Sequence, residues 1–191
     1  MPAQELKIVD PGSGRVQPRG TQGEICFRGY NVMKRYYNNP EATAAAVDGA
    51  GWRHSGDLGV MDPAGYVKIT GRIKEMVIRG GEHLYPREIE EFLRTHDDVM
   101  DVYVHGVPDE KYGEGLMAWV LPKNGNGLDT EAMRAFCDGR ISRHKVPRYW
   151  KFVTGADAFP MTVTGKIQKF KMREIAIREL GLAAAAGVQT A

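Results

Sequence analysis

The 191-residue sequence predicts an α+β fold with a β-rich first part and a second part in which helices pack on a short sheet. Three observations predict it. Residues 1–70 contain alternating apolar segments between glycine-rich turns, and no long helical pattern. Beyond residue 74, strand and helix periods follow one another. Between the two parts, residues 71–75 begin with a glycine and carry charged side chains, which predicts a boundary there.

The first part has the pattern of short strands. Strands are expected at 6–10 and 23–28, and a hairpin with a D-P-A-G turn at 59–70. Two short helical pieces are expected at 31–39 and 40–47, the second beginning with proline. A piece of this size is short for an independent core, so we expect it to belong to a larger domain.

In the second part, segments with the period of a strand alternate with segments with the period of a helix. Its tail, 183–191, offers nothing apolar to bury and is predicted to be disordered. Together the periodic segments predict a small sheet covered by helices. The expected strands lie at 75–79, 99–107, 115–121 and 149–153, and the expected helices at 86–95, 130–138 and 169–180.

Composition favours a cytoplasmic globular protein. No apolar run approaches the roughly 20 residues that cross a membrane, and the N-terminus lacks the apolar core of a secretory signal. The cysteines Cys26 and Cys137 are far apart, which is typical of free thiols in a reducing compartment. We therefore expect no transmembrane segment.

The net charge of +2 conceals an asymmetry. Residues 82–138 carry 13 acidic against 5 basic side chains, and residues 140–178 carry 10 basic against 2 acidic ones. The basic segment suits a polyphosphate ligand, or it neutralises the acidic segment across the fold. Nucleic acid is not expected, because core positions interrupt the basic residues and no nucleic-acid-binding motif accompanies them.

Three motifs stand in order along the chain: W-R-H-S-G-D-L at 52–58, G-R-I-K-E-M-V-I-R-G-G-E-H-L-Y-P at 71–86, and F-P-M-T-V-T-G-K-I-Q-K at 159–169. The middle one predicts a strand, a glycine turn and a helix that begins at a proline. Together they resemble the motifs of the adenylate-forming (AMP-binding) enzymes, which include acyl-CoA synthetases, luciferases and peptide-synthetase adenylation domains. The resemblance spans about residues 6–180.

The resemblance implies a domain assignment. Residues 1–73 would be the incomplete end of the large N-terminal AMP-binding domain, residues 74–182 the mobile C-terminal domain, and residues 183–191 the tail. The family's phosphate loop, adenine contact, magnesium-binding glutamate and acyl pocket belong to the large domain and are not in this sequence. The chain alone is therefore expected to be inactive.

Two charged side chains, Asp57 and Arg72, are candidates for nucleotide contacts. Asp57 sits at a strand edge, where a carboxylate can accept hydrogen bonds from a ribose diol or cap a turn. Taken alone, Arg72 would be an ordinary surface arginine at a domain edge. The resemblance implies that Asp57 binds the ribose of ATP, that Arg72 contacts the nucleotide, and that Lys74 is the hinge about which the small domain rotates.

Lys166 follows a glycine in a turn without large side chains. Taken alone, such a lysine faces solvent. The resemblance implies that it is the adenylation lysine, which binds ATP or AMP and stabilises the charge that develops between the attacking carboxylate and the α-phosphate.

The resemblance also implies a path for coenzyme A. The glycine pair would let the pantetheine arm approach the backbone, and an arginine would meet the phosphates. No metal ligands are expected in this chain. The implied CoA-binding residues are Gly80, Gly81, Glu82, His83, Tyr112, Val146, Pro147 and Arg148.

The expected function is the C-terminal part of an ATP-dependent, AMP-forming acyl-CoA synthetase. It would use ATP, CoA and Mg²⁺ to activate a carboxylic acid as acyl-AMP and pass it to CoA. The segment 161–177 most resembles fatty-acyl, medium-chain-type members. Two alternatives remain open: an adenylation domain that serves a carrier protein, and a non-catalytic nucleotide- or CoA-binding module. The expected partners are the small-molecule substrates and the large domain, and a homodimer is compatible with the sequence.

Overall fold

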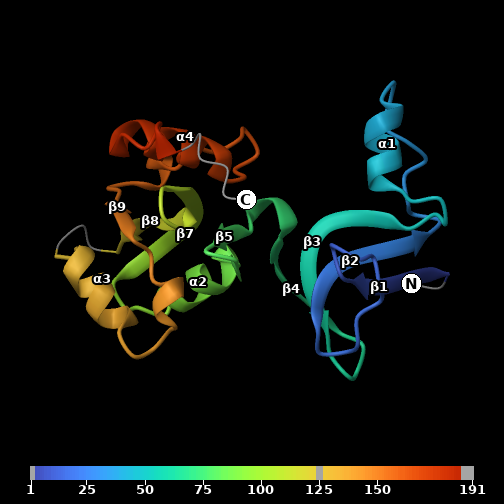
Figure 1. Ribbon diagram of the computed structural model, residues 1–191, viewed down its shortest axis with the longest axis horizontal. Helices are drawn as coiled ribbons and strands as arrows, with labels where there is room; N and C mark the ends of the chain where they lie inside the picture. The colour runs from blue at the N-terminus through green and yellow to red at the C-terminus, as the bar shows by residue number, and fades with distance from the viewer. Residues whose placement is uncertain (1–2, 124–126, 186–191) are drawn as a thin grey trace. The chain divides into compact units, whose positions relative to one another are not determined.

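The computed structural model describes residues 3–123 and 127–185 and divides the chain into two compact units, Met1–Lys74 and Glu75–Ala191 (Figure 1). None of the helices within these residues is long and apolar enough to cross a membrane. Of the predicted tail, Ala183–Ala185 are described and Ala185 is buried, whereas residues 186–191 lie outside the described residues.

The first unit is a four-stranded antiparallel sheet in sequential order. Its strands are β1 (Gln4–Val9), β2 (Gln22–Gly29), β3 (Arg53–Met61) and β4 (Val67–Arg72). The turn between β3 and β4 is closed by a bond from the Gly65 amide to the Asp62 carbonyl, 3.0 Å long, as the D-P-A-G sequence predicts. The buried apolar side chains of this sheet are Ile8, Val9, Ile25, Cys26 and Leu58.

One predicted helical piece of the first unit is wrong. Residues 31–39 form turns and bends, and only α1 (Pro40–Ala46) is helical. Asn38 has a φ of +49°, which an α-helix cannot continue. The Asn39 side chain then accepts a 2.9 Å bond from the Ala42 amide, so the helix starts there.

The second unit is built around β8. Along one edge, β8 pairs with β7 in antiparallel orientation. Along the other edge, the start of β8 pairs with β5, and residues 117–120 pair with β9, which runs parallel to β8. The strands are β5 (Val77–Arg79), β6 (Glu82–Leu84), β7 (Val99–Asp109), β8 (Gly113–Pro122) and β9 (Tyr149–Phe152). The sequence did not predict β6, a three-residue strand that pairs with β5 across the Gly80–Gly81 turn.

Helices cover both faces of this sheet. α2 (Pro86–Leu93) and α3 (Thr130–Cys137) pack on one face, and α4 (Lys169–Leu180) on the other (Figure 1). Along β8, Leu116, Ala118 and Val120 face α2 and α3, while Met117, Trp119 and Leu121 face α4. Burial on both faces explains the continuous apolar run of this strand. The predicted α+β class is confirmed.

Three short 3₁₀ segments connect these elements: Ile73–Glu75, Arg143–Lys145 and Ala156–Ala158. The first lies at the boundary between the two units.

The start of α3 gives a first testable prediction. The Asp129 carboxylate accepts a 2.8 Å hydrogen bond from the Ala132 amide. Asp129→Ala removes this cap and is expected to lower the free energy of unfolding by about 1 kcal/mol, measured by urea denaturation. Asp129→Asn, which can still accept the bond, is the control. Equal losses in both variants would contradict a capping role.

Candidate functional site

Asp57 and Arg72 lie side by side in the first unit. They are cross-strand partners on β3 and β4, and the Arg72 Nε donates a 2.9 Å bond to the Asp57 Oδ1. The arginine side chain is mostly exposed, and the Asp57 carboxylate is partly exposed. The pair therefore presents a carboxylate oxygen and guanidinium nitrogens to solvent at one place, a combination that can bind hydroxyl and phosphate groups.

A buried glutamate holds the part of β3 that leads into Asp57, where the pairing with β2 is irregular. Glu24 accepts a 2.9 Å bond from the Gly56 amide and lies 2.7 Å from the His54 Nδ1. Gly56 has a φ of +72°, which favours glycine. We conclude that Glu24 fixes the backbone directly before Asp57. The sequence analysis assigned no role to Glu24.

The same ring nitrogen of His54 lies 3.5 Å from the Cys26 Sγ. The ligand atoms of Glu24, Cys26 and His54 all lie within 4.8 Å of one another, a grouping of potential metal ligands that the sequence spacing did not indicate. Burial and the nearby Glu24 charge raise the pKa of the Cys26 thiol to about 11. The thiol is therefore protonated at neutral pH, and the hydrogen bonds of Glu24 account for the arrangement.

Lys74 is the last residue of the first unit and is exposed in the 3₁₀ segment Ile73–Glu75. Its place at the boundary is compatible with the predicted hinge, which stays a prediction.

Lys166 lies in an ordered hairpin of the second unit. The Thr162 amide donates to the Lys166 carbonyl at 2.9 Å, and the Lys166 amide donates to the Thr162 Oγ1 at 3.1 Å. An isolated bridge between Met161 and Ile167 closes the hairpin, and Gly165 has a φ of +77°. Within residues 3–123 and 127–185, the exposed Lys166 side chain makes no hydrogen bond or ion pair. A lysine held in this way can offer its charge to a ligand.

The glycine pair forms the two-residue turn between β5 and β6. Gly80 and Gly81 have φ values of +58° and +86°, which is typical of the tight turns that join hairpin strands. The Gly80 amide donates a 2.9 Å bond to the Tyr112 carbonyl. A pocket of about 660 Å³ lies beside this turn, lined by Arg79, Gly80, Glu82, Tyr112, Arg143 and His144.

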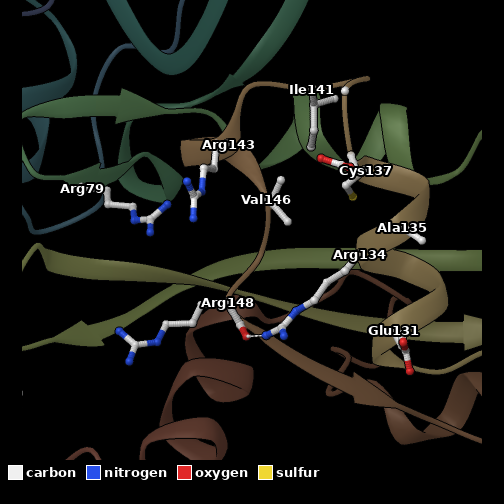
Figure 2. Close-up of a pocket in the computed structure, with 11 residues that line it drawn as sticks. Arg79, Glu131, Arg134, Ala135, Cys137, Ile141, Arg143, Val146 and Arg148 are labelled. Atoms are coloured by element: carbon white, nitrogen blue, oxygen red, sulfur yellow. Dashed lines mark hydrogen bonds between the residues drawn. The ribbon is translucent and has the colours of Figure 1, made fainter.

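A second pocket, of about 840 Å³, adjoins it, because Arg79 and Arg143 line both. Figure 2 shows its four arginines, Arg79, Arg134, Arg143 and Arg148, which come from different segments of the second unit. Against them the lining holds two acidic side chains, Glu131 and Asp138. This excess of guanidinium groups suits a ligand with several phosphates.

Arg148 is held in place by Asp109. The Arg148 Nη1 donates a 2.6 Å bond to the Asp109 Oδ2, whose side chain is almost fully buried. Burial alone would raise the pKa of Asp109. The amide bonds from Tyr112 and Lys111 and the Arg148 charge outweigh it and hold this pKa below its usual value. The ionised carboxylate therefore orients Arg148 at the pocket, and its amide bonds fix the turn that carries Tyr112.

The residues predicted to bind CoA thus divide into those that line one of the two pockets and those that do not. Of the implied CoA-binding residues, Gly80, Glu82, Tyr112, Val146 and Arg148 line the two pockets. Gly81, His83 and Pro147 do not line either pocket: Gly81 and His83 are exposed, and Pro147 is buried. Arg79, Arg134, Arg143 and His144 also line the pockets and were not predicted from the sequence. The basic bias of residues 140–178 was the available signal for Arg143.

Two protein-family models match the chain. The model of the AMP-binding enzyme family matches residues 1–37, and that of the AMP-binding enzyme C-terminal domain matches residues 88–166. The chain belongs to the AMP-binding family of adenylate-forming enzymes.

Among curated relatives, the putative acyl-CoA synthetase YngI of Bacillus subtilis is 52% identical over 95% of the chain, which covers 33% of that protein. The human mitochondrial medium-chain acyl-CoA ligase ACSF2 is 44% identical over 95% of the chain and 29% of its own length. The chain thus spans about a third of the length of these relatives.

Solved structures with ligands are similar too. ATP-bound MatB of Rhodopseudomonas palustris is 36% identical, with a TM-score of 0.86 over 92% of this chain and 34% of that one. The o-succinylbenzoate CoA synthetase MenE of Bacillus subtilis, in complex with its acyl-adenylate intermediate, is 28% identical, with a TM-score of 0.80 over 91% of this chain and 34% of that one.

Proposed function

We propose that this chain supplies the C-terminal part of an AMP-forming acyl-CoA ligase. The observation that carries the proposal is an exposed Lys166 on an ordered hairpin, with no side-chain partner among the described residues. The same unit holds the arginine-lined pocket of about 840 Å³, which adjoins the pocket beside the glycine turn. An acyl-CoA ligase needs both: a positive charge for the adenylation step and a phosphate-binding surface for CoA.

In this proposal the residues divide the work. Asp57 accepts hydrogen bonds from the ribose of ATP, and Arg72, its partner, contacts the nucleotide. Lys166 stabilises the negative charge that builds between the attacking carboxylate and the α-phosphate. A rotation at Lys74 then exchanges Lys166 for the Gly80–Gly81 turn, where the CoA thiol arrives. Mg²⁺ would be held by residues outside this chain, where it would neutralise the phosphates of ATP.

The CoA nucleotide is assigned to the arginine-lined pocket. Its phosphates would meet Arg79, Arg143 and Arg148, and the pantetheine arm would pass over the glycine turn toward the reaction centre. Gly81, His83 and Pro147 stay in the proposal as neighbours of this path. A volume of about 840 Å³ lies within the range of roughly 300–1,000 Å³ that is usual for small-molecule sites.

The substrate class proposed is a fatty or medium-chain carboxylic acid, which the name of ACSF2, a medium-chain acyl-CoA ligase, supports; the name of YngI supports an acyl-CoA product without a chain length. The proposal also places the protein in the cytoplasm, supported by the two free, buried cysteines. Packing against a large N-terminal domain is part of the proposal, and a homodimer is compatible with it.

The test is to complete the enzyme. The chain is fused behind the preceding two thirds of YngI, and the product is called the completed enzyme. We expect it to exchange pyrophosphate into ATP when a fatty acid is present and to form the acyl-CoA thioester, whereas the 191-residue chain alone does neither. A folded but inactive completed enzyme, or exchange by the chain alone, would overturn the proposal.

A non-catalytic CoA-binding module is the second candidate, because both pockets lie wholly within the second unit. Titration of the isolated chain with CoA, followed by calorimetry, tests it. Binding by the chain together with an inactive completed enzyme would favour this candidate over the ligase.

The pocket assignment gives a second prediction. Arg143→Ala in the completed enzyme is expected to raise the KM for CoA about 10- to 100-fold, because a hydrogen bond to a charged group contributes about 1.5–3 kcal/mol. The KM for ATP should not change. Arg140→Ala is the control, since Arg140 lies over the Phe136 ring and does not line the pocket. Equal effects of both substitutions on the KM for CoA would contradict the assignment.

A further inference from the structure

An ion-pair cluster joins the first turn of α4 to the residue that follows the boundary between the units. The Lys169 Nζ lies 2.8 Å from the Glu75 Oε2 and 2.8 Å from the Glu90 Oε1. Only 15% of the Lys169 side chain and 7% of the Glu90 side chain are exposed. The Glu90 Oε1 also accepts a 2.8 Å bond from the Val104 amide. Lys169 therefore connects the segment after Lys74 with α2 and, through Glu90, with β7.

A second contact runs parallel to the first, one helical turn further along α4. The Arg173 Nη1 donates a 2.6 Å bond to the Glu114 Oε1. The Glu114 Oε2 accepts a 2.9 Å bond from the Ile78 amide. Positions 169 and 173 lie on the same side of the helix. The segment 75–78 is thus attached to α4 at two points.

The Lys166 hairpin is joined directly to this anchored helix end. Only two residues separate Lys166 from Lys169, and the Gln168 amide donates a 2.8 Å bond to the Pro160 carbonyl, across the base of the hairpin. The hairpin therefore cannot move far relative to Lys169 without breaking a hydrogen bond. A continuous series of contacts leads from Glu75 through Lys169 to Lys166.

We propose that Glu75 and Lys169 are positioning residues that make Lys166 follow rotation at Lys74. This inference rests on the proposed function. Glu75 comes directly after Lys74, so it is the first side chain to move when the Lys74 torsions change. Because the ion pair connects Glu75 to the base of the hairpin, Lys166 moves together with Glu75 when the chain rotates at Lys74. The loop between them absorbs little of the rotation.

Lys169 and Glu90 are more buried than the surface pairs of the same unit, whereas the Glu75 side chain is 35% exposed. In the Lys151–Glu179 pair, which also involves α4, the glutamate side chain is 46% exposed. Surface pairs of this kind contribute little to structure, because water replaces them readily. A largely buried lysine with two carboxylate partners has few alternative partners, so the position of its ammonium group is well defined.

Glu75→Gln is the variant that tests the inference. It removes the ion pair next to Lys74 and keeps the Lys169–Glu90 pair, and glutamine at a partly exposed position leaves no buried charge unpaired. Lys169→Met would strand Glu90 and can unfold the domain. Glu179→Gln is the matched control on the same helix.

The first measurement uses the 191-residue chain. In Glu75→Gln, amide hydrogen exchange at Thr162 and Gln168, at the base of the hairpin, is expected to become about tenfold faster, as loss of a charged contact predicts. In Glu179→Gln it should match the unsubstituted chain. Unchanged exchange in Glu75→Gln would overturn the inference, whatever the outcome for the enzyme.

The second measurement separates the half-reactions in the completed enzyme. Glu75→Gln is expected to lower the rate of pyrophosphate exchange about tenfold without a change in the KM for ATP, and to leave thioester formation from added acyl-adenylate within about twofold. A merely structural role would lower both half-reactions together, and that result overturns the inference. If Lys166→Ala is inactive and Glu75→Gln is fully active, the proposed function stands and the positioning role does not.

Discussion

Replacing Lys166 by alanine is expected to lower the rate of acyl-adenylate formation by the completed enzyme about 10²–10³-fold, the usual effect of removing one preorganised charge donor. Lys166 suits this role because its ammonium group has no partner among the residues that the structure describes, while its backbone is fixed at two points to Thr162. The charge is therefore available and its position is defined before substrate arrives. The measurement is fatty-acid-dependent exchange of pyrophosphate into ATP.

The second half-reaction provides the internal control. With acyl-adenylate added directly, Lys166→Ala should form thioester at nearly the rate of the unsubstituted enzyme, because no charge then builds between a carboxylate and the α-phosphate. Lys171→Ala, an exposed lysine on α4, should affect neither step. Equal losses in both half-reactions would show that Lys166 supports the fold or CoA binding instead.

Much of the fold was predictable because the decisive patterns are local. β8 is a run of apolar residues on both faces, and α2 begins at Pro86, as its sequence predicts. The failures are equally local in cause. β6 is three residues long and has too little pattern to detect. Residues 31–39, where a helix was wrongly predicted, form turns and bends, and Asn38 takes a positive φ.

The candidate sites were predictable only where one short motif carries them. Lys166 was singled out because it lies in the motif at 159–169 that resembles the adenylate-forming enzymes, and its whole hairpin, 161–167, falls within that motif. The contact between Asp57 and Arg72 depends on the register of β3 and β4, which periodicity alone does not give. Glu24 lies 30 positions before His54, so its contacts with the residues before Asp57 become visible only in the folded sheet.

The arginine-lined pocket could not be assembled from the sequence for the same reason. Its arginines come from β5, from α3 and from the segment before β9. The basic bias of residues 140–178, which suited either a polyphosphate ligand or neutralisation of the acidic segment, was the signal for Arg143 and Arg148. It gave no signal for Arg79 and Arg134, which lie in or beside the acidic segment.

Stability of the second unit is expected to fall by about 3 kcal/mol as the pH drops from 6.5 to 4, because of His105. This side chain is 4% exposed on β7, its Nδ1 lies 3.1 Å from the Gly106 carbonyl oxygen, and its Nε2 has no partner within the described residues. Burial lowers the pKa of His105 to about 4, and the charges of Lys169 and Arg173 on α4 act in the same direction.

The sign follows from proton binding. Between pH 4 and 6.5 the imidazole is neutral in the folded chain and protonated in the unfolded chain, so the unfolded state holds more protons and gains stability as the pH falls. Above pH 6.5 both states are neutral, and the full stability is present. Urea unfolding at pH 7, 5.5 and 4.5 measures this slope directly.

His105→Leu should remove this part of the slope, because leucine has no proton to bind and fits a buried position near the Trp119 ring. His144→Gln, in the exposed 3₁₀ segment Arg143–Lys145, should leave it unchanged. Carboxylates contribute their own slope at low pH in every variant, so the difference between His105→Leu and the unsubstituted chain isolates the imidazole. If the two slopes were the same, His105 would bind protons equally in the folded and the unfolded chain, and that result would contradict a pKa lowered by burial.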